Sequence, residues 1–154
     1  MTMNTLRPSA HCVGEANLHL QFTPAYRRDV FQSRVLRDVT TSLLVEQADK
    51  LGIHISALDY GPDHMHLFIE NWRRWSVADL AKRLKGASSH ALRKSYKYLF
   101  EEKLWGKKFW TGGYFYRTVG AVTAETVRKY VAESQSKHWP DQDATSQKTL
   151  LIYH

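Results

Sequence analysis

The stretch Gly61-Pro62-Asp63-His64-Met65-His66-Leu67-Phe68-Ile69-Glu70 combines a tight turn with a strand that carries two histidines. Gly, Pro and Asp favour turns, and the alternation that follows them is typical of a β-strand. Alternate side chains of a strand point to the same face, so His64 and His66 project together. Met65 and the apolar residues that alternate with the histidines face the opposite way, toward the predicted core.

Two imidazoles on one strand form a possible pair of metal ligands. The alternative is a half-buried strand whose polar face carries histidines without any metal. The spacing alone does not decide between these two interpretations, because a short motif needs structural context.

Length and cysteine content favour one compact cytoplasmic domain. The chain has 154 residues, enough for a single core without a disulfide or structural zinc. We expect one domain over residues 1–154, with a core of about 10–138 and a C-terminal tail over 139–154. The single Cys12 cannot form an internal disulfide, which fits a reducing compartment. No membrane-spanning run or signal peptide is evident, so no membrane partner is expected.

Positive charge is concentrated in the second half of the chain. The net charge is +7 and the pI is about 9.6, and the segment 73–108 contains eleven Lys or Arg against three acidic residues. Aromatic residues lie in or beside this segment: Trp72, Trp75, Tyr96, Tyr98, Trp105, Phe109 and Trp110. Cations bind phosphates and aromatic faces stack on unpaired bases, so the combination favours single-stranded nucleic acid. The alternative is that the tryptophans are core residues and the lysines a solvated face.

The order of predicted elements indicates an α+β fold. Strands are expected over 10–22, 53–60, 64–70 and 114–119. Helices are expected over 33–51, from the capping box that begins at Ser76, and over about 123–137. The order β-α-β-β-α-β followed by a helix is that of a ferredoxin-like split β-α-β antiparallel sheet with helices on one face. His64 and His66 would then lie on the uncovered face of the sheet.

Tyr130 lies in the last predicted helix, and two roles are open for it. Val127, Tyr130, Val131 and Ser134 share one helical face, so Tyr130 fits an ordinary core tyrosine with its hydroxyl at the rim. As a nucleophile, its phenol would need a polarised electrophile or a base, because its normal pKa is about 10.

Several ordered segments resemble one family. They are Pro62–Leu67, Lys129–Val131 with Gln135, His19–Leu20 through Pro24–Phe31, Leu104–Trp105 through Gly113–Phe115, and Thr118–Gly120. Together they resemble the single-tyrosine HUH transposases, the TnpA type of short insertion sequences that move as single-stranded DNA. The likeness covers most of residues 15–138.

The resemblance implies a metal-dependent DNA transposase. His64 and His66 would bind Mg²⁺ or Mn²⁺, and Tyr130 would attack the scissile phosphate to form a 5′-phosphotyrosine link. A second transesterification would rejoin the ends. The substrate would be single-stranded DNA with hairpins at the element ends, and the protein a homodimer in which subunits can share active sites. Charge alone selects the candidate DNA contacts: Arg73, Arg74, Lys82, Lys85, Arg93, Lys107 and Lys108.

The third metal ligand departs from the family pattern. The family places a glutamine four residues after the tyrosine, whereas this chain has Ser134 there and Gln135 one residue later. A π-bulge would realign Gln135, which we take as the third ligand. The alternative is Glu133, whose carboxylate suits Mg²⁺ better than an amide does.

Other functions remain to be weighed. A domesticated relative that processes palindromes, or a rolling-circle nickase, would share the same chemistry. A non-catalytic nucleic-acid-binding module would be expected to present aromatics at mid-strand, where this chain has His64 and His66. A histidine-based phosphohydrolase would have a third histidine at the position of Phe68.

Overall fold

The computed structural model describes residues 7–8, 13–14, 17–98, 108–119 and 124–139. Its centre is a four-stranded antiparallel sheet in the order β4-β5-β3-β6. The strands are β3 (Asn17–Phe22), β4 (His54–Gly61), β5 (His64–Glu70) and β6 (Phe115–Val119). A separate two-stranded ribbon pairs β1 (Arg7–Pro8) with β2 (Val13–Gly14). The predicted α+β class is confirmed.

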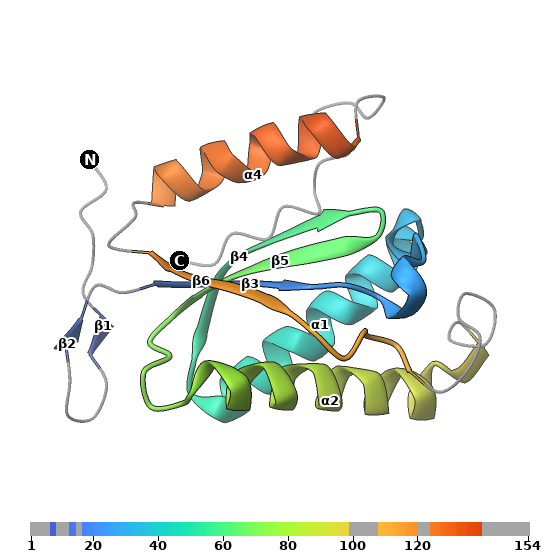
Figure 1. Ribbon diagram of the computed structural model, residues 1–154, viewed down its shortest axis with the longest axis horizontal. Helices are drawn as coiled ribbons and strands as arrows, with labels where there is room; N and C mark the ends of the chain where they lie inside the picture. Colours follow the sequence, from blue (N-terminus) through green and yellow to red (C-terminus); the bar gives the residue numbers. More distant parts are fainter. Residues whose placement is uncertain (1–6, 9–12, 15–16, 99–107, 120–123, 140–154) are drawn as a thin grey trace.

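Two long helices cover one face of the sheet (Figure 1). Helix α1 spans Arg34–Leu51 and α2 spans Val77–Ser95. The side chain of Ser33 caps α1 and that of Ser76 caps α2, each by accepting a backbone N–H from three residues on. Gly52 ends α1 in the left-handed region with φ 72°, a conformation that glycine adopts without steric cost. The predicted helix starts are therefore confirmed.

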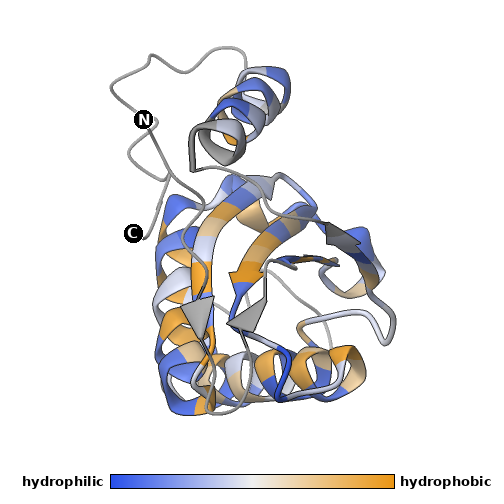
Figure 2. Cartoon of the chain, turned by 90° about the vertical axis from the view of Figure 1, so that its left-hand side faces the viewer, coloured by the Kyte–Doolittle hydropathy of each residue, from blue (hydrophilic) through white to orange (hydrophobic). Residues whose placement is uncertain are grey.

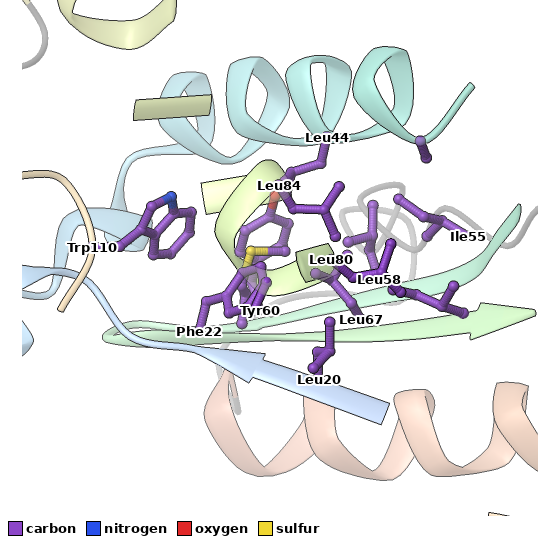
Figure 3. Packing of buried hydrophobic residues seen from close by; sticks show 14 of the residues in the cluster. Leu20, Phe22, Leu44, Ile55, Leu58, Tyr60, Leu67, Leu80, Leu84 and Trp110 are labelled. Atoms are coloured by element: carbon purple, nitrogen blue, oxygen red, sulfur yellow. The ribbon is translucent and has the colours of Figure 1, made fainter. Parts of the chain in front are cut away.

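The main core lies between the sheet and these two helices (Figure 3). Met65, Leu67 and Ile69 of β5 are fully buried in it, as the alternation of the strand predicts. Phe109 and Trp110 are also buried there. Aromatic residues of the basic segment are thus largely core residues, and Tyr98, with 67% of its surface exposed, is the exception among the described ones. Trp105 lies outside the described residues.

Helix α4 (Ala124–His138) packs on the opposite face of the sheet (Figures 1 and 2). Val131 is fully buried against Ala57 of β4 and the partly buried Phe68 of β5. The predicted arrangement of two helices on one face and a further C-terminal helix is confirmed, and the face that was expected to be open carries that C-terminal helix. A small apolar contact is enough to seat α4 over a face that is otherwise polar.

The N-terminal region departs from the predicted elements. The long strand expected over 10–22 begins only at Asn17. Two short 3₁₀ turns, η1 (Ala25–Arg27) and η2 (Val30–Gln32), follow it and were not predicted. Tyr26 and Arg27 have φ of 60° and 51°, which local propensity does not favour. Among the described residues, no helix is long and apolar enough to cross a lipid bilayer.

Candidate active site

His64 and His66 lie side by side on the face of β5 that carries α4. Their ring centroids are 5.1 Å apart, and both side chains are mostly shielded from solvent. The strand alternation places them there, because Met65 between them faces the core on the other side of the sheet.

Each imidazole is held through its Nδ1 atom. Nδ1 of His64 is 2.9 Å from a carboxylate oxygen of Asp63, which in turn pairs with Arg27 at 3.3 Å. Nδ1 of His66 is 2.7 Å from Nε2 of His19 on the neighbouring strand β3. The hydrogen bond with His64 is the main reason that the pKa of Asp63 is lowered. Coordination of a cation by either histidine would therefore use Nε2, with Nδ1 already anchored, as is usual for ligating histidines.

His19 was assigned no role from the sequence. It is only 5% exposed, and its ring stacks on Phe68 at a centroid distance of 4.7 Å with an interplanar angle of 11°. Burial, with a smaller contribution from the charge of Arg117, lowers the pKa of His19 to about 4. The imidazole is therefore neutral at pH 7. The register that pairs β3 with β5 brings it to His66, and this register is not visible in the sequence.

Tyr130 extends from α4 toward this histidine cluster. Its ring centroid lies 5.4 Å from that of Phe68, 6.2 Å from that of His19 and 6.4 Å from that of His66. The side chain is 41% exposed, so it is neither a core residue nor a fully solvated one. Burial, followed by the negative charge of Asp59, raises the pKa of Tyr130. The phenol is therefore protonated at neutral pH.

Gln135 reaches the same face, but its amide nitrogen is engaged elsewhere. Nε2 donates hydrogen bonds to a carboxylate oxygen of Asp59 and, at 3.0 Å, to the carbonyl oxygen of Tyr60. Helix α4 is a regular α-helix over its described length, so the π-bulge invoked to realign Gln135 is absent. Glu133 is exposed. Asp59, whose backbone pairs with His66, was missed by sequence reasoning.

The donor set fits a divalent cation in part. His64 and His66 offer two anchored imidazoles on one rigid strand, a suitable pair of nitrogen ligands. Across the described ranges, no three His, Cys, Asp or Glu side chains are grouped closely enough to hold a metal. The third ligand would have to come from an amide such as Gln135, from water or from the substrate.

The predicted DNA contacts are not gathered around the histidines. Lys82 and Arg93 are exposed on α2, on the opposite side of the sheet from His64 and His66 (Figure 1). Arg73, Arg74 and Lys108 are exposed in connecting segments, and Lys107 lies outside the described residues. Lys85 is partly buried and donates a 3.1 Å hydrogen bond to the carbonyl oxygen of Gly113. Burial is the main reason that its pKa is lowered.

A shallow groove of about 380 Å³ lies between these two regions. We call it the β3–β6 groove, and its lining residues are Gln21, Thr23, Arg27, Thr111, Gly113, Tyr114 and Phe115. Gln21 is paired in the sheet with both His66 and Phe115, so one end of the groove adjoins the histidines. Gly113, which also lines the groove, accepts a hydrogen bond from Lys85 of α2. The groove therefore connects the basic helix to the histidine face.

Fold, charge and site together define the class. A basic α+β protein with two histidines on the sheet face that carries a tyrosine-bearing helix fits an enzyme that acts on DNA. The family model described as "Transposase IS200 like" matches residues 12–134, most of the chain. The protein therefore belongs to the IS200-like transposase family, whose members are DNA-cleaving and strand-transfer enzymes. The resemblance inferred from the sequence motifs is confirmed.

Individual relatives agree with this assignment. The chain is 30% identical over 125 residues to the ISDra2 transposase TnpA of Deinococcus radiodurans, covering 81% of this chain and 88% of that one. It is 29% identical over 144 residues to the transposase for insertion sequence element IS200 of Salmonella typhimurium, covering 94% and 90%.

Two solved structures share the fold. One is a crystal structure from Deinococcus radiodurans R1 of a protein assigned as a transposase, with a TM-score of 0.65 and 25% identity, covering 84% of this chain and 98% of that one. The other is a REP-associated tyrosine transposase bound to a REP hairpin, with a TM-score of 0.55 and 12% identity, covering 86% and 72%. At 12% identity, the second likeness concerns the fold alone.

Proposed function

We propose that this transposase cleaves and rejoins single-stranded DNA at hairpin-flanked ends through a 5′-phosphotyrosine intermediate on Tyr130. The observation that carries the proposal is the juxtaposition of Tyr130 with His66, whose ring centroids are 6.4 Å apart on one face of the sheet. In the core-tyrosine alternative the ring would be buried, whereas 41% of Tyr130 is exposed. Membership of the IS200-like transposase family supports DNA as the substrate.

His64 and His66 would hold a divalent cation, Mg²⁺ or Mn²⁺, through their Nε2 atoms. Such a cation supplies Lewis-acid polarisation of a phosphate oxygen. Gln135 remains our choice for a third ligand, because its amide donates to Asp59 and to Tyr60 through Nε2, whereas a cation would be bound by Oε1. Glu133, which is exposed on α4, is the less favoured candidate.

The chemical step exchanges one phosphodiester bond for another. The phenolic oxygen of Tyr130 attacks the phosphorus and loses its proton, while the bond from phosphorus to the 3′ oxygen breaks. The released 3′ oxygen takes up a proton and becomes a hydroxyl. Attack by a 3′-hydroxyl on the phosphotyrosine reverses these changes and rejoins a strand, so no external energy source is consumed. Partial burial of Tyr130 excludes some of the water that would compete as nucleophile.

The β3–β6 groove offers a path for the unpaired strand. Phe115 is 54% exposed and Tyr114 is 38% exposed, and aromatic faces of this kind stack on bases. Arg27 lies at the same groove and is paired with Asp63 beside His64. Paired DNA would contact the exposed cations of α2, and the strand would then pass through the groove toward the histidines.

We further infer a homodimer from the family resemblance. Within one chain, His66 of β5 and Tyr130 of α4 are already neighbours, so this arrangement does not require an exchange of helices between subunits. Light scattering on the purified protein measures the assembly directly. A mass of one chain at micromolar concentration, with and without hairpin DNA, would contradict the dimer.

The decisive experiment replaces Tyr130 by phenylalanine. Tyr130→Phe keeps the ring contacts and removes the attacking oxygen, so it should bind hairpin DNA like the wild type and form no covalent adduct. The assay incubates labelled single-stranded element ends with protein and Mn²⁺, denatures the sample and looks for a protein-linked DNA band. Tyr98→Phe, at an exposed tyrosine beyond α2, is the matched control and should retain wild-type yield. An adduct at wild-type level in Tyr130→Phe would refute the nucleophile.

A second variant separates the metal from the nucleophile. His64→Ala should abolish adduct formation and spare the fold, because the side chain lies outside the main core. Continued Mn²⁺-dependent nicking by this variant would exclude His64 as a ligand.

A further inference from the structure

We propose that His19 is a positioning residue that fixes the tautomer and ring orientation of His66 for metal binding. The inference rests on the proposed function, because it concerns the cation that His64 and His66 would hold. Sequence reasoning gave His19 no role, although it lies in one of the segments that resemble the family. Three contacts of its buried ring carry the argument.

The first contact is the hydrogen bond itself. Nε2 of His19 lies 2.7 Å from Nδ1 of His66, and one proton must lie between them. If His66 is to coordinate through Nε2, that nitrogen must be deprotonated and Nδ1 must carry the proton of the neutral ring. In that tautomer, Nδ1–H of His66 donates the hydrogen bond and Nε2 of His19 accepts it. The tautomer of a ligating histidine is set by the partner of its other nitrogen, and here that partner is His19.

The second and third contacts hold the His19 ring in place. One face stacks on Phe68 at a centroid distance of 4.7 Å, and the ring of Phe115 lies at a centroid distance of 6.4 Å, at 76° to that of His19. The ring is 5% exposed, so few other orientations are available to it. A histidine whose ring is clamped in this way can restrain its neighbour, whereas a mobile surface histidine cannot.

A direct ligand role for His19 does not fit the geometry. Its Nε2 is the atom that faces His66. Within the part of the chain that the structure describes, His19, His64 and His66 do not form a group able to hold a metal. The two proposed ligands are instead held in the same way. Asp63 contacts Nδ1 of His64, and His19 contacts Nδ1 of His66.

Two substitutions separate the hydrogen bond from the packing. His19→Phe keeps a flat ring to stack on Phe68 and removes the acceptor. His19→Gln loses the ring, but its amide places a polar atom close to the position of Nε2. We expect His19→Phe to weaken Mn²⁺ binding at least tenfold and His19→Gln to restore most of the affinity. His90→Phe, at an exposed histidine on α2, should bind Mn²⁺ like the wild type.

The readouts are Mn²⁺ affinity, measured by electron paramagnetic resonance on the full chain without DNA, and the His66 tautomer, measured from ¹⁵N shifts in metal-free protein. Wild-type His66 should carry its proton on Nδ1, and His19→Phe should shift it toward Nε2–H. Unchanged affinity in His19→Phe, equal weakening in both variants, or a wild-type His66 protonated on Nε2 would each overturn the positioning role. Wild-type Mn²⁺ binding that His64→Ala leaves intact would instead show that the proposed metal site fails, and the inference with it.

Discussion

At the scale of single residues, the position of His64 depends on the absence of a side chain at Gly61. The imidazole of His64 packs over Gly61 so closely that a Cβ atom there would overlap three of its ring atoms. The backbone of Gly61 is not in the left-handed region, so space and not conformation requires the glycine. The residue that begins the Gly-Pro-Asp turn thus also shapes the site.

Gly61→Ala should displace His64 and spare the fold. The added methyl group forces the ring away from its place beside Asp63, so we expect at least tenfold weaker Mn²⁺ binding and a similar loss of adduct. Gly86→Ala is the control: nothing lies within 4 Å of a Cβ there, and the change should stabilise α2 by about 1 kcal/mol. Metal titration and thermal melting of both variants measure these effects. Wild-type Mn²⁺ affinity in Gly61→Ala would contradict the crowding argument.

The lowered pKa of His19 predicts a pH-dependent stability in metal-free protein. Its folded pKa of about 4 lies below the ordinary value of 6.5, so the unfolded chain binds the proton more readily. Stability is then fully present above pH 6.5 and is lost as the pH falls toward 4. Over this pH range we expect a loss of about 2 kcal/mol of stability. Melting with a chelator at several pH values should show this slope, and His19→Phe should reduce it.

The sequence predicts a residue's face but not its neighbours across the sheet. Strand alternation was enough to predict that His64 and His66 share a face, because it depends only on residues that are close in the sequence. His19 and Asp59 reach His66 only through the registers of β3 and β4 on either side of β5. Register depends on long-range pairing, so both residues remained without a role until the structure was known.

At the scale of elements, α4 is the part of the fold that joins tyrosine to histidines. Its described contacts with the sheet include Val131 against Ala57 and Phe68, the ring of Tyr130 against that of Phe68, and Gln135 against β4. Trp139 adds a 2.9 Å hydrogen bond from Nε1 to the carbonyl oxygen of Tyr60. Helical periodicity predicted the helix, but not the side of the sheet on which it packs, because the mostly polar face of the sheet gave no sign of being covered.

Val131→Asp should detach α4 and leave the main core intact. A charge buried between Ala57 and Phe68 would be costly without a partner, whereas the helix can move into solvent. We expect loss of the covalent adduct, faster amide exchange in α4 and little change in protection of β3, β4 and β5. Ala132→Asp, one residue further on an exposed side, adds the same charge and should keep its activity. Full adduct yield in Val131→Asp would show that cleavage does not require α4 to pack on the sheet.

At the scale of the whole molecule, the candidate site and the predicted DNA contacts of α2 lie on opposite faces of one sheet. The histidines and Tyr130 lie on the side of α4, while the exposed Lys82 and Arg93 belong to α2, which covers the other side of the sheet (Figure 1). Composition predicted a polyanionic partner, but it did not reveal this separation. The β3–β6 groove includes Gln21, which is paired with His66, and Gly113, which is bonded to Lys85 of α2, so we propose it as the path of a DNA strand that contacts both faces.

Removing charge from α2 should therefore weaken DNA binding more than removing charge from α1. We expect the double variant Lys82→Gln, Arg93→Gln to reduce the slope of log affinity against log salt by about 1.5, since each lost phosphate contact contributes about 0.7 to 0.9. The matched double variant Arg34→Gln, Lys50→Gln removes the same charge from α1, where both residues have acidic partners one turn away, and should leave the slope unchanged. Fluorescence anisotropy with hairpin DNA at several salt concentrations measures both slopes. Equal changes in the two variants would show that the DNA responds to net charge and not to the surface of α2.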